Sequence, residues 1–287
     1  MKQLRRTPFV GVLVALTIAA LAACASPAPA NTEEPVVEFP AGSTMAKLAE
    51  AGEITVAVKF DAPPFGARDL SGNLEGFDIE VAKAIAAALG ISEENINWIE
   101  ATVPNRELFL QQGKVDMVIA SYAINDERKE VVTFAGPYLT DKVQLAVQPG
   151  NPKGITAASD LNGLQVCALG NNVERLATAA PEAISVQFDN DTGCIKALQN
   201  GQIDAWLSGL SDLLAARDKD PSAIEIIDVD LPVPSNQYGI GLLKGDTEFC
   251  EFVDGVLEEA VSSGDYDSWV EDKLGVDATI PEFIPCA

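Results

Sequence analysis

Short apolar runs alternate along the chain with stretches in which apolar residues recur every fourth position. Ile54 to Phe60 and Ile96 to Glu100 have the patterns of strands. Between them, an apolar stripe from Phe77 to Leu89 predicts a helix that ends at Gly90. Such alternation is typical of a mostly parallel sheet covered by helices, so we expect an α/β fold.

A second set of strands and helices lies between two extended segments, Asp141 to Gln148 and Asn236 to Leu243, which lack a helical period. Strands are expected at Leu164–Ala168, Ile184–Phe188, Ile203–Ser208 and Ala223–Asp228, and helices at Val173–Ala180, Gly193–Asn200 and Ser211–Arg217. The chain therefore leaves one lobe, builds another and returns. We expect residues 44–142 and 240–287 to form lobe 1 and residues 143–239 to form lobe 2, joined by two hinge strands.

A candidate anion site lies where a buried strand is followed by a helix. Val115 to Ile119 is an apolar run that predicts a strand buried on both faces. Asn125 is a good N-cap for a helix that carries Arg128 on its first turn. The free amides of a helix start and a guanidinium both suit a small carboxylate. The alternative is that Arg128 is a surface charge paired with Glu127 or Glu130.

Five segments resemble, in order, the family 3 bacterial extracellular solute-binding proteins. They are VAVKFDAPPFG at 56–66, GFDIEV at 76–81, NDERKEVVTFAGPYL at 125–139, IKALQNGQIDAWL at 195–207 and QYGIGLLKGDTE at 237–248. Proteins of this family serve ABC importers of polar amino acids and related solutes. The resemblance covers nearly the whole chain after its N-terminal region. It implies a periplasmic-binding-protein-like clamshell, in which two α/β lobes close around a ligand by a hinge motion.

The resemblance also implies a set of residues that bind a ligand carboxylate. Lobe 1 offers the carbonyl of Ser121, the amide of Ala123 and the side chain of Arg128. Lobe 2 offers the amides of a loop that contains Asn171 and Asn172, and which of these two faces the ligand is left open. A ligand held by donors from both lobes would stabilise the closed form, which an importer is expected to recognise.

Recognition of the ligand side chain is expected to be cationic, because VKFD at 58–61 resembles the glutamate- and aspartate-binding members. Lys59 is then expected to bind a second carboxylate, with Phe60, Phe65 and Tyr122 as apolar walls. Arg106 is a weaker candidate for the same role as Lys59, and the favoured interpretation of Arg106 is a helix-surface charge near Glu107. The alternative for Lys59 is a solvated strand end.

Two positions depart from the pattern of amino-acid binders, and both concern the ligand ammonium group. Ala123 stands where Ser or Thr is usual, and Gly209 stands where an Asp usually pairs with the ammonium. Losing the charged partner of a buried ammonium costs about 2–5 kcal/mol if nothing replaces it. Asp212 and Asp61 are the candidates for replacement, so recognition of the α-amino group stays open.

The N-terminal residues have the features of an export signal. Basic residues precede an apolar stretch from Phe9 to Ala22, which is short for a membrane span. The residues before Cys24 resemble a lipobox, which implies a signal peptide over residues 1–23, a lipid on Cys24 and a flexible spacer over 24–43. The alternative is an ordinary signal peptide with a coincidental cysteine. The expected location is the extracytoplasmic face of the cell membrane.

The remaining four cysteines form an even set, which in an exported protein suggests disulfides. Sequence alone does not fix the pairing. We favour Cys167 with Cys194, each at the edge of a predicted lobe 2 element, and Cys250 with Cys286, which would fasten the C-terminal tail to a helix. Free thiols and zinc ligands are the alternatives, but the chain has no histidine and no CxxC motif, so no metal is expected.

Net charge and motifs narrow the function further. A net charge of −24 argues against binding nucleic acid or anionic lipid. The leading hypothesis is a monomeric, lipid-anchored binding subunit that delivers glutamate or aspartate to an ABC permease without a cofactor. Alternatives are a carboxylate binder without α-amino recognition, a ligand sensor, and an enzyme like the dehydratases of this fold. Glu174 is the only acid that we can name for the enzyme.

Overall fold

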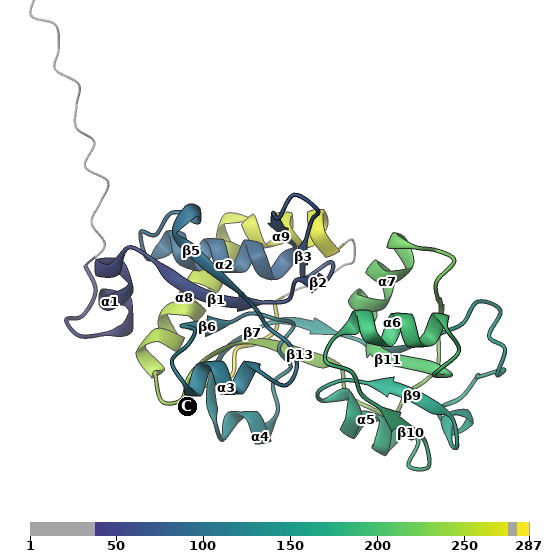
Figure 1. Ribbon diagram of the computed structural model, residues 1–287. Coiled ribbons are helices and arrows are strands. Elements are labelled where there is room, and N and C mark those ends of the chain that lie inside the picture. The colour runs from purple at the N-terminus through teal and green to yellow at the C-terminus, as the bar shows by residue number, and fades with distance from the viewer. Residues whose placement is uncertain (1–37, 275–279, 287) are drawn as a thin grey trace, which may run out of the picture. The chain divides into compact units, whose positions relative to one another are not determined.

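Two five-stranded sheets, each with helices on both faces, form the framework of the protein (Figure 1). The computed structural model describes residues 38–274 and 280–286, which belong to the compact unit Val37–Ala287. The predicted signal peptide, Cys24 and most of the predicted spacer lie outside the described residues. None of the described helices is long and apolar enough to cross a membrane.

The first sheet has the strand order β5-β1-β6-β13-β7 and defines the first lobe. Strands β1, β5 and β6 are parallel, whereas β13 runs antiparallel to both β6 and β7. The bounds are β1 Ile54–Val58, β5 Ile96–Glu100, β6 Met117–Val118, β7 Val132–Asp141 and β13 Asn236–Leu243. Beside this sheet lies a small antiparallel sheet of β2 Asp61–Ala62, β3 Gly66–Arg68 and β4 Leu74–Glu75.

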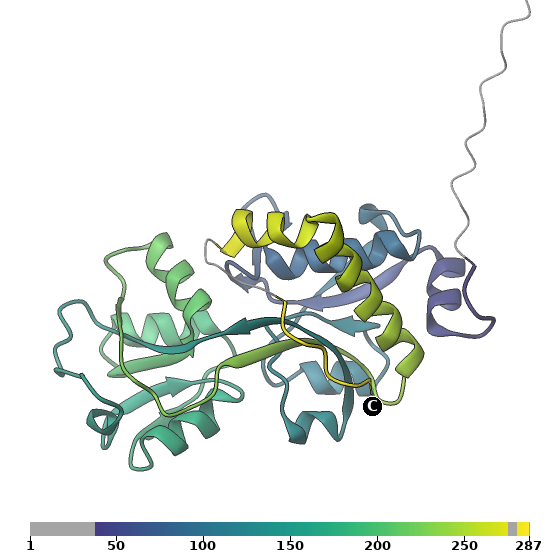
Figure 2. The same cartoon turned by 180° about the vertical axis from the view of Figure 1, so that it is seen from behind.

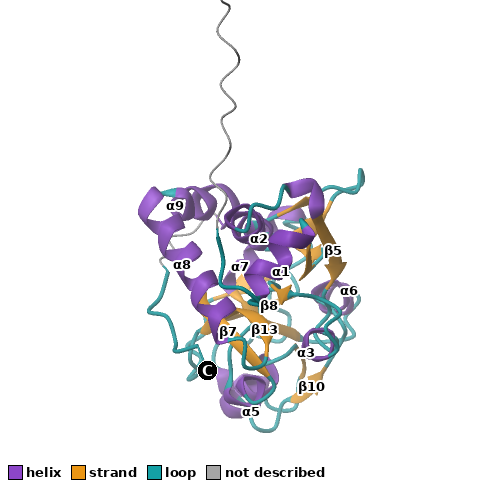
Figure 3. Ribbon diagram, turned by 90° about the vertical axis from the view of Figure 1, so that its left-hand side faces the viewer, coloured by secondary structure: helices purple, strands orange, loops and turns teal. Residues whose placement is uncertain are grey.

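Helices cover both faces of the first sheet (Figure 3). Helices α2, α8 and α9 pack their apolar residues with those of β1 into the larger core cluster, and α3 packs on the opposite face. The bounds are α1 Thr44–Ala51, α2 Phe77–Ala88, α3 Arg106–Gln111, α4 Asp126–Lys129, α8 Thr247–Ser263 and α9 Asp265–Trp269. The predicted stripe from Phe77 to Leu89 is thus the buried side of α2, where Phe77, Val81 and Ile85 have no exposed surface.

The second sheet has the order β10-β9-β11-β8-β12 and defines the second lobe. Its bounds are β8 Val143–Val147, β9 Gln165–Ala168, β10 Ile184–Val186, β11 Ala205–Gly209 and β12 Glu225–Ile227. Helix α5 (Asn172–Ala179) packs on one face, and α6 (Asp191–Gln199) and α7 (Leu210–Lys219) pack on the other. Short irregular helices occupy Glu93–Asn95, Ala158–Leu161 and Val270–Leu274.

Two crossings of the chain join the lobes, as Figure 2 shows from behind. Strand β7 passes into β8 through Lys142, and the chain returns from the second sheet to enter β13 at Asn236. The two crossings are paired, because Asn236 lies opposite Asp141 in the β7–β13 ladder. The predicted α/β clamshell with two hinge strands is therefore confirmed, although the extended segment predicted from Asp141 is the end of one strand and the start of another.

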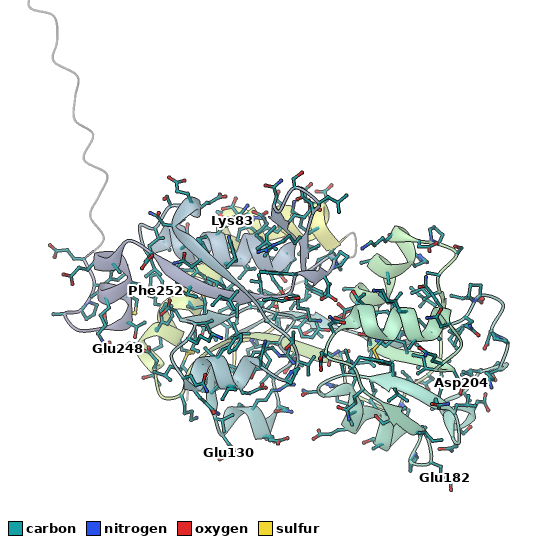
Figure 4. All side chains as sticks on the ribbon, viewed as in Figure 1. Lys83, Glu130, Glu182, Asp204, Glu248 and Phe252 are labelled. Carbon is teal, nitrogen blue, oxygen red and sulfur yellow. A yellow bond between two sulfur atoms is a disulfide. The ribbon has the colours of Figure 1, made fainter. Side chains whose placement is uncertain are left out.

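Two disulfides reinforce these elements, and their pairing is the one favoured from the sequence. Cys167 in β9 is bonded to Cys194 in α6, and Cys250 in α8 is bonded to Cys286 in the C-terminal tail. With its cysteines bonded to each other, the Cys250, Asp254 and Cys286 cluster offers no thiolates to a metal. On the surface, acidic side chains such as Glu130, Glu182 and Glu248 project outward (Figure 4).

Candidate functional site

A small polar cavity lies between the two lobes, next to the crossings. Its solvent-accessible cavity volume is about 40 Å³. The whole empty volume, which includes solvent at the mouth of the cavity, is about 390 Å³. Residues of the first lobe and the β13 crossing that line it are Lys59, Val103, Arg106, Ser121, Ala123, Arg128, Asn236 and Tyr238; those of the second lobe are Leu169, Gly170, Asn171, Asn172, Asp191, Ser208 and Asp212.

One end of the cavity carries two buried guanidinium groups, those of Arg106 and Arg128. Arg106 is 4% exposed, so its interpretation as a helix-surface charge is wrong. Both groups lie over the ring of Tyr122, with the carbon of the Arg106 group 4.5 Å and that of the Arg128 group 4.9 Å from its centroid. Arg106 donates to the carbonyl of Ala120 at 3.2 Å, and Arg128 forms an ion pair with Glu107 at 3.0 Å. Burial, and then the neighbouring charge of Arg106, lowers the pKa of Arg128 to about 10. Two cations against one acid make this end of the cavity suitable for a carboxylate.

The start of α4 holds Arg128 in place. The side chain of Asn125 accepts a hydrogen bond from the Arg128 amide at 2.7 Å, as an N-cap does, and the Arg128 guanidinium donates to the carbonyl of Ala123 at 2.5 Å. Arg128 is only 9% exposed, so the alternative of a surface charge is wrong. Its ion pair is with Glu107 of α3, not with Glu127 or Glu130.

The loop of the second lobe meets this end from across the cleft. Asn171 accepts from Asn125 at 2.8 Å and donates to the carbonyl of Ile124 at 3.3 Å, so its side chain joins the lobes. The side-chain oxygen of Asn172 is buried and has no hydrogen-bond partner within the described part of the chain. Of the two asparagines, Asn172 is the one whose side chain still offers an acceptor to a ligand.

Another part of the cavity lining carries carboxylates. Lys59 and Asp191 form a buried ion pair of 2.6 Å between the two lobes. Burial lowers the pKa of the Lys59 ammonium, but Asp191 and Asp212 outweigh it and leave that pKa raised. The charge of Lys59 is therefore already compensated, which the sequence did not reveal because Asp191 lies 132 residues away.

Asp212 is the acid in this part of the lining that lacks a charged partner in direct contact. Its Oδ2 accepts from Ser208 Oγ at 3.1 Å, whereas its Oδ1 has no hydrogen-bond partner among the residues that the structure describes. Asn236 likewise has a buried side-chain oxygen without a described partner. Burial, opposed by Lys59, raises the pKa of Asp212 to about 8. Two buried acceptors without a described partner, both on residues that line one cavity, suit an ammonium group.

Gly209 has no room for the acid that the family usually places there. A Cβ atom at Gly209 would overlap Oδ2 of Asp141 and lie 2.6 Å from the hydroxyl of Tyr238. Asp141 accepts from the amide and hydroxyl of Ser211 at 3.3 and 3.1 Å and from Tyr238 at 3.2 Å. The carboxylate of Asp141 thus occupies the space beside Gly209.

A buried acid behind the cavity supports Ser121. Asp78 accepts from the Ser121 amide at 2.8 Å and from the hydroxyl of Tyr138 at 2.7 Å. Ser121 has a positive φ of 40°, which is uncommon for a residue other than glycine. Burial raises the pKa of Asp78 to about 6. Asp78 lies in the GFDIEV segment, but this supporting role was not predicted from the sequence.

Six of the predicted ligand-binding residues line the cavity, and four do not. Lys59, Ser121, Ala123, Arg128, Asn171 and Asn172 line it; Phe60, Phe65, Tyr122 and Gly209 are not among the lining residues. Phe65 is fully buried with its ring against Tyr238, and Phe60 lies under the guanidinium of Arg68. The apolar wall is formed by Val103 and Leu169 instead.

Asp191, Ser208, Asn236 and Tyr238 also line the cavity but were not predicted. Glu174, the acid named for an enzyme, lines a different hollow beside Glu107.

Two α/β lobes with a polar cavity at their hinge define a clamshell solute receptor. The chain belongs to the bacterial extracellular solute-binding proteins, family 3, whose model matches residues 54–275. It is a substrate-binding protein of the amino-acid ABC transporter kind, and its place is outside the cytoplasm.

Curated relatives and solved structures agree with this assignment. The glutamate-binding protein GluB of Corynebacterium efficiens is 27% identical over 249 residues, which cover 83% of this chain and 84% of the relative. The L-cystine-binding protein TcyJ of Escherichia coli is 30% identical over 238 residues, covering 81% and 86%. A structure of an ancestral arginine-binding protein bound to arginine is 34% identical with a TM-score of 0.69, covering 77% of this chain and 97% of that chain. These relatives are binding proteins, and the chain is a solute receptor and not an enzyme.

Proposed function

We propose that the protein captures an α-amino acid in its zwitterionic form and delivers it to an ABC permease. The ligand carboxylate lies at the Arg106 and Arg128 end, together with the amides of the lobe 2 loop. The ligand ammonium lies between Asp212 and Asn236. The observation that carries this proposal is that residues lining one cavity supply both two buried guanidinium groups and two buried acceptor oxygens without a described partner.

Asp212 supplies the carboxylate that amino-acid binders usually place at the position of Gly209. It lies three residues further along the chain, at the start of α7, and its free oxygen belongs to a residue that lines the cavity. An ammonium group there would gain a charged partner and relieve an unpaired buried acceptor. This assignment favours an amino acid over a carboxylate that lacks an amino group.

The charges near the ligand side chain favour a polar but uncharged group. The nearest cation, Lys59, is bound to Asp191, and a second carboxylate would approach Asp191 and Asp212 as well. Glutamate is the second candidate, because Lys59 lines the cavity and the relative GluB is a glutamate-binding protein. It would require Lys59 to be shared between Asp191 and the ligand.

Calorimetric titration against L-amino acids and their decarboxylated amines tests the carboxylate end. Arg128→Ala should weaken binding of every amino acid by about 30-fold or more, because it removes a charged partner from a buried carboxylate. Arg217→Ala is the matched control, since Arg217 pairs with the adjacent Asp218 on the surface of α7. Equal affinity of Arg128→Ala and Arg217→Ala would contradict the assigned orientation.

The lipid anchor and the permease partner complete the proposal. Cys24 is the proposed attachment site, so radiolabelled fatty acid should be incorporated into the wild-type protein and not into Cys24→Ser. The released variant should keep its affinity for amino acids, because the cavity is built from residues that begin at Lys59. Label on the Cys24→Ser variant would contradict the assignment.

A further inference from the structure

A second, larger cavity adjoins the ligand cavity. It lies between β2 of the first lobe and helices α6 and α7 of the second, which Figure 1 shows facing each other. Its solvent-accessible cavity volume is about 220 Å³, compared with about 40 Å³ for the first cavity. Asp191 and Asp212 line both cavities, so a molecule whose ammonium lies at Asp212 stands at the boundary between them.

The difference in volume assigns different parts of a ligand to the two cavities. A single water needs roughly 10–15 Å³ by this measure, so the first cavity has room for only a few atoms, such as a carboxylate, an α-carbon and an ammonium group. The second cavity has several times that room, enough for a side chain of several non-hydrogen atoms. An amino acid oriented as proposed above therefore directs its side chain into the second cavity.

Among the polar residues that line this second cavity, two from opposite lobes carry a buried group without a described partner. Trp206 is 1% exposed, and its indole N–H has no hydrogen-bond partner within the described residues. Asp61, on β2, has a buried carboxylate oxygen, Oδ2, that also lacks a described partner. Both residues line the cavity, whose apolar wall includes Pro63 and Ile195. The residues that line the cavity thus supply an apolar wall, one buried donor without a described partner on Trp206 and two such acceptors, on Asp61 and on Asp212 at the boundary. Asp220 and the ammonium groups of Lys196 and Lys219 belong to the same lining.

We propose that the second cavity binds a ligand side chain that ends in a neutral amide or urea group. The carbonyl of such a group accepts from Trp206, and its N–H donates to Asp61. This inference rests on the proposed function, because it takes the orientation of the α-amino acid from the first cavity. An apolar side chain would leave both buried groups unpaired, and a cationic one would leave the indole N–H facing another donor.

Trp206→Phe tests the donor, because it removes the N–H and keeps an aromatic ring. Binding should be measured for citrulline and glutamine, which end in urea and amide groups, and for arginine and norleucine. We expect wild type to bind citrulline or glutamine more tightly than arginine and norleucine. Trp206→Phe should weaken that amide or urea ligand about 3- to 10-fold, the usual value of one hydrogen bond, and change norleucine less than twofold.

Two further variants keep the test decisive. Trp98→Phe is the control, because Trp98 is partly buried in β5 against the core of the first lobe. This variant should not change the affinity for any of the ligands. Asp61→Ala removes the acceptor without altering the second lobe and should also weaken binding of the amide or urea ligand selectively. Two results would overturn the side-chain assignment: tighter binding of arginine than of citrulline and glutamine by wild type, or an equal loss of affinity for norleucine and citrulline in Trp206→Phe. Neither result would contradict the proposed amino-acid receptor. No binding of any amino acid would overturn both.

Discussion

The charge of Asp212 is the most testable element of the proposed ligand site. The substitution Asp212→Asn keeps the size of the side chain and one acceptor oxygen but removes the carboxylate. Asp212 is 6% exposed and is held by Ser208, so the replacement has little freedom to move away. Because the ammonium of the ligand loses its buried charged partner, affinity should fall by 2–5 kcal/mol, or about 30- to 5,000-fold.

The pH dependence of binding gives the same prediction a second readout. Burial raises the pKa of Asp212 to about 8, so at pH 7 the carboxyl of the free protein is mostly protonated. Binding an ammonium requires the ionised form, so it should release close to one proton at pH 7. The affinity of the wild type should then rise with pH below about pH 8, by close to tenfold per unit well below that pKa and by less near it, and this rise should be absent in Asp212→Asn.

The stability of the free protein should change in the opposite direction to binding. The folded-state pKa of Asp212 lies above its unfolded value near 3.8, so between about pH 4 and 8 the folded state binds the extra proton. Stability contributed by this group is therefore present at low pH and lost as pH rises. Asn cannot ionise, so the stability of Asp212→Asn should not fall as pH rises through this range. At pH 8 the variant should therefore unfold at a higher temperature than wild type, although it binds amino acids more weakly.

Calorimetric titration at pH 6, 7 and 8, in buffers of different ionisation enthalpy, measures affinity and proton release together. Thermal unfolding at the same pH values supplies the stability comparison. Asp141 and Asp78, whose pKa values burial raises to about 6, titrate in both proteins, so the difference between the two profiles reports Asp212 together with its electrostatic effect on Asp141 and Lys59. Affinity of Asp212→Asn within threefold of wild type, or parallel pH profiles, would refute the reasoning.

Two further predictions concern packing and crosslinks. Gly209→Asp should destabilise the protein because its side chain overlaps Asp141, and Asp141→Ala in the same chain should recover part of that loss; equal urea midpoints for Gly209→Asp and wild type would show that the space is not filled. Replacing Cys250 and Cys286 together by Ser should lower the free energy of unfolding by about 2–4 kcal/mol, because their bond closes a long loop, whereas an unchanged midpoint in denaturant would exclude this role.

Local signals in the sequence were sufficient for the elements that depend on neighbouring residues. Strand β5 has the bounds that its pattern predicted, and α4 begins after Asn125 because the capping side chain and the amide that it binds are three residues apart. Strand β7 was not predicted, since Gly136 and Pro137 interrupt its pattern. The strand predicted from Val115 to Ile119 is only Met117–Val118, because it pairs with short stretches of β1 and β13.

Long-range contacts decided the parts of the site that the sequence did not reveal. The sequence places Lys59 at the end of a strand near the cleft, but it does not show that Asp191 of the other lobe neutralises its charge. The meaning of Gly209 depends on Asp141, which lies at the end of a different strand. Phe65 is fully buried in the core instead of the cavity. Each of these outcomes depends on which strands and helices become neighbours, which spacing along one chain does not specify.

The position of β13 in the first sheet sets an order for biosynthesis. Strand β13 ends at Leu243 and lies between β6 and β7, so the first sheet is incomplete until the ribosome has made the whole second lobe. Until then, β6 and β7 both present open edges, the kind of surface that pairs with other chains. A nascent chain therefore carries these open edges from the synthesis of β6 and β7 until that of β13, and a holding chaperone should protect it most effectively before residue 243 emerges.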